Sequence, residues 1–122
     1  MTMLDRSLIV LGGIAGLTGV ALAAMAAHVT GGGNLQTASQ FLLVHAPAVL
    51  AAAILAGSGL VHGPIARAAG FAFVAGLILF CGDLSLRALY AVAPLPMAAP
   101  TGGMILMAGW LALAVAGLFG RR

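Results

Sequence analysis

The fold is decided by the stretch Ala75–Tyr90, AGLILFCGDLSLRALY, which is apolar enough to lie in a lipid bilayer and yet contains Asp83 and Arg87. The two charged residues are four positions apart with the acid first, the favourable order for an ion pair on one helix face. An isolated ion in hydrocarbon costs about 2.5–3.5 kcal/mol on the insertion scale, so such residues usually pair and face a protein interior. The stretch therefore predicts a membrane helix enclosed by other apolar helices.

The composition of the whole chain is that of a membrane protein. Of its 122 residues, 63% are hydrophobic and only 6% are charged, and the mean hydropathy is +1.21. So few charges cannot solvate a globular surface, and we expect residues 1–122 to form a single integral membrane domain with the lipid bilayer as its partner. The net charge of +3 does not indicate nucleic-acid binding, because the basic residues are dispersed arginines that form no patch.

The hydrophobic runs predict an all-α membrane protein, a four-transmembrane-helix bundle. The first run begins after Arg6 and ends in an Ala-Met-Ala that resembles a signal-peptide cleavage site. At about 21 residues it is long enough to span a bilayer and longer than a signal peptide requires, so we interpret it as a helix. Glycine- and proline-rich loops separate the runs, one of them from His28 to Gln36. The spans are expected at residues 7–27, 37–57, 67–91 and 100–120.

The arginines predict how the chain is oriented. Four spans place both termini on one side of the membrane, together with the loop between the second and third spans. That side contains Arg6, Arg67, Arg121 and Arg122, whereas the two loops on the opposite side contain no basic residue. Because basic residues accumulate in cytoplasmic loops, we expect the N and C termini to be cytoplasmic, in a bacterial inner (plasma) membrane.

Small residues recur at helical spacing in the first and last spans. Such residues let helix backbones approach closely, which in lipid is a main source of helix association. Packing within the chain is the first interpretation, and a homodimer face is the alternative. The candidate packing positions are Gly12, Gly16, Gly19, Gly102, Gly103 and Gly109.

Several polar residues are predicted to gather in the outer half of the bundle. The rise of a helix places His45 roughly 12 Å below the outer surface and Asp83 roughly 6 Å below it. The Asp83–Arg87 pair either orients the third helix or relays protons or ions, and His45 either forms an interhelical hydrogen bond or acts as a ligand or relay. The candidate cluster consists of His28, Gln40, His45, Asp83 and Arg87.

The sequence gives little support for a cofactor or for catalysis. His28 and His45 differ in predicted height by roughly 12 Å, too much to hold one haem between them. No histidine pair has a spacing diagnostic of a metal site, and the single cysteine, Cys81, excludes an internal disulfide. Since no phosphate loop, nucleophile elbow or paired-carboxylate site is present, we expect no cofactor, no metal and no enzymatic activity.

Four segments together resemble a known family. They are AAMAAHV, LQTASQFLLVHA, LILFCGDLSLRAL and APTGGMILMAGWLALA, and their order resembles the domain-of-unknown-function 423 family of small bacterial inner-membrane proteins. The resemblance extends from about Gly12 to Leu118 and implies four transmembrane helices without an established activity. Asp83 and Arg87 stand where that family more often has Ser-Gly-Ser followed by apolar residues, and Pro47 replaces what is usually an apolar, helix-compatible residue.

The sequence thus favours a small integral membrane protein without an established activity that acts as a structural or accessory component of a larger membrane complex. Another membrane protein is one candidate partner, and a second copy of the chain, which would make a homo-oligomer, is the other. The alternative is a small transporter or channel for protons, ions or a small solute that uses the outer-half polar cluster. The two functions differ in what the cluster does: it holds the helices together in the first and contacts the transported species in the second.

Overall fold

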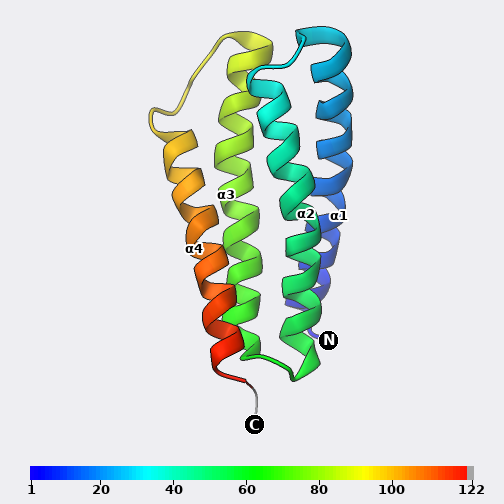
Figure 1. Ribbon diagram of the computed structural model, residues 1–122, viewed down its shortest axis with the longest axis vertical. Helices are drawn as coiled ribbons and strands as arrows, with labels where there is room; N and C mark the ends of the chain where they lie inside the picture. The colour runs from blue at the N-terminus through cyan, green and yellow to red at the C-terminus, as the bar shows by residue number, and fades with distance from the viewer. Residues whose placement is uncertain (121–122) are drawn as a thin grey trace.

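The computed structural model describes residues 1–120, which form four long helices lying side by side and running alternately up and down (Figure 1). No strand occurs in this part of the chain. The first helix continues directly into a short π-helical turn, η1. The elements are α1 Met3–Met25, η1 Ala26–Thr30, α2 Asn34–Ser58, α3 Gly63–Tyr90 and α4 Ala98–Leu118.

All four helices are long and apolar enough to cross a membrane. Counted with η1, they contain 28, 25, 28 and 21 residues, and about 20 apolar residues suffice for the hydrocarbon core of a bilayer. Both ends of the described chain, and the α2–α3 connection, lie at the same end of the molecule (Figure 1). Arg121 and Arg122, which were used to predict the orientation, lie outside the described residues.

The two middle helices, α2 and α3, form the centre of the molecule. Extensive contacts join each helix to its neighbour in sequence, and a smaller contact joins α1 to α3. The fully buried side chains Leu8, Val49 and Phe73 belong to the hydrophobic core that these contacts enclose. The outer helices α1 and α4 therefore present long apolar faces to their surroundings, as expected where lipid or another membrane protein replaces water.

Both ends of the first helix, and the start of the second, differ from the predicted boundaries. The first helix begins at Met3 because Thr2 and Asp5 form a capping box, each side chain hydrogen-bonded to the backbone N–H of the other. At the other end the chain stays helical through η1 to Thr30, because neither glycine nor proline occurs between Gly19 and Gly31. The turn is only three glycines, all with positive φ, and α2 starts at Asn34 rather than after the predicted loop of residues 28–36.

Three glycines of α1 occupy the contact with α2. A Cβ added at Gly12 would lie 2.8 Å from the side chain of Leu50, and one at Gly19 would lie 3.0 Å from Leu43. At Gly16 the nearest α2 atom would be 3.7 Å away, an ordinary contact. Gly13, one position from Gly12, faces open space. The close approach of α1 to α2 thus depends on Gly12 and Gly19 more than on Gly16.

The α3–α4 contact is closer, because backbone meets backbone. A Cβ at Gly102 would lie 2.6 Å from the backbone nitrogen of Phe80, and one at Gly109 would lie 2.8 Å from the ring of Phe73. Gly103 is looser, with its nearest neighbour 3.9 Å away. These contacts fix the antiparallel register of the two helices: seven residues along α4 match seven along α3.

Candidate functional site

His45 on α2 and Trp110 on α4 form a hydrogen bond across the middle of the molecule. The indole Nε1–H of Trp110 donates to Nε2 of His45 at 3.0 Å. The other ring nitrogen, Nδ1, lies 2.8 Å from the backbone carbonyl of Phe41, one turn earlier on α2. With Nδ1 as the donor to this carbonyl, Nε2 is left as the acceptor for the indole, so a neutral ring satisfies both nitrogens at once.

Aromatic rings surround His45 and exclude other polar partners. Its imidazole lies 5.6 Å from the ring of Phe73 and 5.7 Å from the rings of Phe41 and Trp110, measured between centroids. Phe73 in turn lies 4.8 Å from Trp110. His45 is only 5% exposed, whereas Trp110 is 44% exposed at the outer surface of α4. The arrangement joins α2, α3 and α4, and it leaves neither histidine nitrogen free for a metal or a relay.

Asp83 and Arg87 form the predicted ion pair within α3. Arg87 Nε donates to Asp83 Oδ2 at 2.9 Å. The aspartate is 4% exposed, and its second oxygen, Oδ1, is buried without a hydrogen-bond partner in the described chain. Among the buried side chains of residues 1–120 this oxygen is the one polar atom found without a hydrogen-bond partner. Leaving a buried acceptor unpaired costs about 1–3 kcal/mol.

The helix register places Asp83 at the start of α4. Gly109 packs on Phe73 and Gly102 packs on Phe80. Because the two helices are antiparallel, Asp83, three residues after Phe80, lies at the level of the first turn of α4, which precedes Gly102. Beyond that level α3 continues without α4 beside it, still next to α1 and α2, and residues 91–97 connect its end to α4 (Figure 1). The carboxylate therefore lies where the two-helix contact ends.

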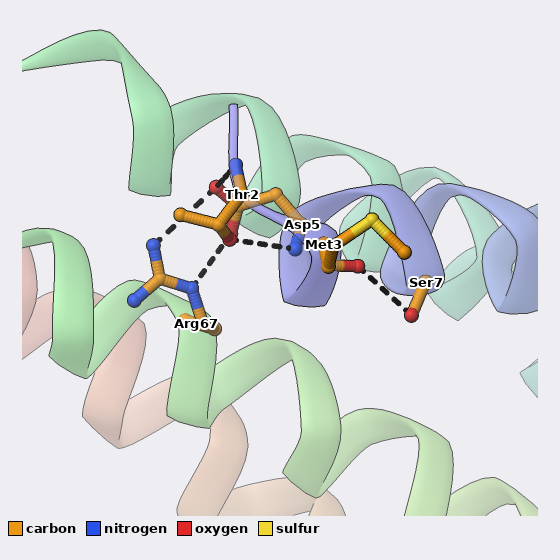
Figure 2. Close-up of polar contacts among 5 residues, drawn as sticks. All are labelled: Thr2, Met3, Asp5, Ser7 and Arg67. Atoms are coloured by element: carbon orange, nitrogen blue, oxygen red, sulfur yellow. Dashed lines mark hydrogen bonds and ion pairs between the residues drawn. The ribbon is translucent and has the colours of Figure 1, made fainter.

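A second ion pair, which the sequence pattern does not predict, joins α1 to α3. Arg67 Nε donates to Asp5 Oδ1 at 2.7 Å, and Arg67 Nη2 donates to Asp5 Oδ2 at 3.3 Å. The backbone N–H of Thr2 also donates to Oδ2, at 3.2 Å (Figure 2). The side chain of Asp5 is 1% exposed and that of Arg67 is 21% exposed. This two-bond ion pair joins α1 to α3 at the end of the molecule where the chain begins.

The five predicted cluster residues do not form one network. Hydrogen bonds join Asp83 only to Arg87, while His45 bonds to α4 and to its own helix. His28 is exposed on η1, and Gln40 is exposed on α2; neither side chain makes a hydrogen bond within residues 1–120. The depth estimate brought these residues to similar heights, but height alone does not decide which helix faces they occupy.

The described residues contain no group of three histidine, cysteine, aspartate or glutamate side chains placed to hold a metal ion. The thiol of Cys81 is buried, and its Sγ–H donates to the carbonyl oxygen of Ala38 at 3.4 Å, another link between α2 and α3. Two hollows open on the surface. One, of about 430 Å³, lies between α1, η1 and α2; the other, of about 380 Å³, is an apolar groove between α1 and α3.

These features define a small α-helical protein with four helices of membrane-spanning length and a few polar contacts that join the helices. The family model described as "Protein of unknown function (DUF423)" matches residues 22–103, and the chain belongs to this family. The resemblance noted in the sequence is thereby confirmed. Comparisons with curated proteins and with solved structures find no match.

The matched range contains one partner of each of the two hydrogen-bonded side-chain pairs that join different helices, His45–Trp110 and Asp5–Arg67. His45 and Arg67 lie within residues 22–103, whereas Trp110 and Asp5 lie outside them. Asp83 and Arg87 both lie within the range.

Proposed function

We propose that this chain is a multi-pass protein of the bacterial inner membrane with both termini in the cytoplasm, and that it acts without catalysis as a structural or accessory component. The orientation is supported by Arg6 and Arg67, which lie at the end of the molecule that carries the termini, whereas the connections at the opposite end, residues 31–33 and 91–97, contain no basic residue.

The observation that carries the proposal is the use of the buried polar side chains. His45 and Asp5 have all their polar side-chain atoms hydrogen-bonded inside the protein, and each joins two helices. Polar groups that a transporter or enzyme employs need an atom available to substrate. These residues instead stabilise the helix arrangement, which favours a structural role.

The partner of such a component would contact the outer helices. Large apolar side chains on α1 and α4, among them Leu17 and Met104, are 72% and 66% exposed. Another membrane protein or a second copy of this chain would cover them in part, with lipid over the rest; nucleic acid has no place on such a surface.

The proposal is tested by placing a photo-reactive amino acid at Leu17 and at Met104 in cells, with the exposed Ile54 of the central helix α2 as the matched control. We expect one discrete protein adduct from an outer-helix position and none from Ile54. Adducts to lipid alone at every position would contradict the proposal.

One observation favours a second candidate, a small transporter or channel for protons, ions or a small solute. Asp83 Oδ1 is buried in a membrane-spanning helix and has no partner, a state that is more usual at functional sites than in structural pairs. In proteoliposomes the second candidate requires that Asp83→Asn abolish flux while Ser85→Ala, on the same helix, does not. Equal flux in both variants would exclude Asp83 as part of a transport path.

A further inference from the structure

The hollow between α1, η1 and α2 lies next to the turn that connects these helices, and small residues line one side of it. Ala23 and Ala27 line it from α1 and η1, and Gly32 lines it from the turn. A Cβ at Gly32 would lie 3.0 Å from Oε1 of Gln36, so only glycine leaves this corner open. The π-helical turn η1 widens the helix here, and such turns occur frequently at functional sites. The volume of about 430 Å³ lies within the range of small-molecule sites.

The polar side chains in this hollow have unused hydrogen-bonding groups. Gln36 and Gln40 are four residues apart, so they project from the same face of α2. Neither side-chain amide forms a hydrogen bond within the described chain, and each offers two donor hydrogens and one acceptor oxygen. Between them Ser39 is buried, and its hydroxyl donates to the backbone carbonyl of Gln36 at 2.7 Å.

The lining also decides which ligands are excluded. No charged side chain lines the hollow, so it lacks the guanidinium or carboxylate that would compensate an ionic ligand. Two free amides next to alanine and leucine side chains match an uncharged group that carries both donors and acceptors on a small apolar frame.

We propose that this hollow, the Gln36–Gln40 pocket, is a binding site for an uncharged hydroxyl-bearing group of the glycerol type. Such a group is available from a lipid with a glycerol head or from a free polyol. Because the pocket lies at the end of the α1–α2 hairpin, at the level where a bilayer head-group region is expected, both sources can reach it. The inference is independent of the accessory role, since it concerns a ligand and not a protein partner.

The chain itself provides a specific probe, because Gln36 and Gln40 are its only glutamines. Protein labelled with ¹⁵N-glutamine therefore shows two side-chain amide groups in a nuclear magnetic resonance spectrum. In micelles of a zwitterionic detergent, we expect both groups to shift saturably on addition of monoacylglycerol or of free glycerol. A response to monoacylglycerol alone identifies lipid as the source, and a response to both identifies the polyol group itself.

Matched variants separate the pocket from general solvent effects. Ala23→Leu fills the pocket and should abolish saturation, whereas Ala24→Leu, on the exposed face next to it, should leave it unchanged. Gln40→Leu removes one amide without adding bulk and should weaken binding about two- to tenfold, as expected from the loss of one hydrogen bond. Should Ala23→Leu fail to fold, Gln40→Leu still provides the test. Absence of a saturable shift in the unmodified protein, or equal shifts in Ala23→Leu and Ala24→Leu, would overturn the proposal.

Discussion

Replacing Trp110 by phenylalanine tests the hydrogen bond that joins α4 to α2. The substitution keeps an aromatic ring beside Phe73 and removes the indole N–H, so His45 Nε2 loses its donor at 3.0 Å. A ring flip offers no remedy, because Nδ1 is already committed to the carbonyl of Phe41. The histidine is 5% exposed and cannot recover the bond from water.

The loss of unfolding free energy expected for this substitution follows from two known ranges of hydrogen-bond energies. An unsatisfied buried polar group costs about 1–3 kcal/mol in a water-soluble protein. Hydrogen bonds between membrane helices average about 0.6 kcal/mol with a maximum near 1.7, because the membrane-embedded unfolded state also finds partners. Since the aromatic rings around His45 exclude a substitute donor, we expect a loss near the upper end, about 1–1.5 kcal/mol of unfolding free energy.

The assay is unfolding by sodium dodecyl sulfate in mixed micelles, followed by pulse proteolysis, which does not depend on the chain's single tryptophan. The double variant with His45→Leu should be less destabilised than the sum of the two single variants, because removing both partners leaves no orphaned acceptor. Exact additivity, or a loss below about 0.3 kcal/mol for the tryptophan variant, would refute the proposed role of the bond.

Three further predictions use the same unfolding assay. Gly102→Ala should lower the free energy of unfolding by about 1–3 kcal/mol, because its Cβ meets backbone atoms that cannot move aside, while Gly103→Ala should be nearly neutral; equal losses would contradict the α3–α4 register. Asp5→Asn should cost about 2 kcal/mol by leaving its arginine partner on α3 without a countercharge, whereas Arg6→Gln, at an exposed position, should stay within about 0.5 kcal/mol. Cys81 should resist alkylation by N-ethylmaleimide until detergent unfolds the chain, since its thiol is buried against α2; rapid labelling of the folded protein would show that the α2–α3 contact opens.

Much of the fold follows from the sequence, because long apolar runs leave few alternatives to membrane-spanning helices. All four runs are helices in the structure, and the chain contains the expected family match. The helix ends were less predictable. Composition indicated a loop from His28, but a π-helical turn carries the helix on to Thr30 before the glycines end it. The composition of residues 28–36 could not show that the chain changes from an α-helix to a wider π-helical turn instead of leaving the helix at His28.

The site was predictable only where both partners lie on one helix. Asp83 and Arg87 pair because their spacing is local, and the sequence shows it directly. The partners of His45 and Asp5 lie 65 and 62 residues away in sequence, so they depend on which helix faces meet. A signal for the His45–Trp110 bond was present, since ten residues into the fourth predicted span corresponds to roughly 15 Å, close to the depth derived for His45. Asp5 was missed because it precedes the first apolar run.

Whether this chain serves as an accessory component of a larger membrane assembly can be decided from its mass in the native state. Membranes are extracted with a mild detergent, and the intact complex is weighed by mass spectrometry. We expect an assembly in which this 12.0 kDa chain is present in fixed stoichiometry with another membrane protein or with further copies of itself. A lone monomer would contradict it and would direct attention to flux through Asp83.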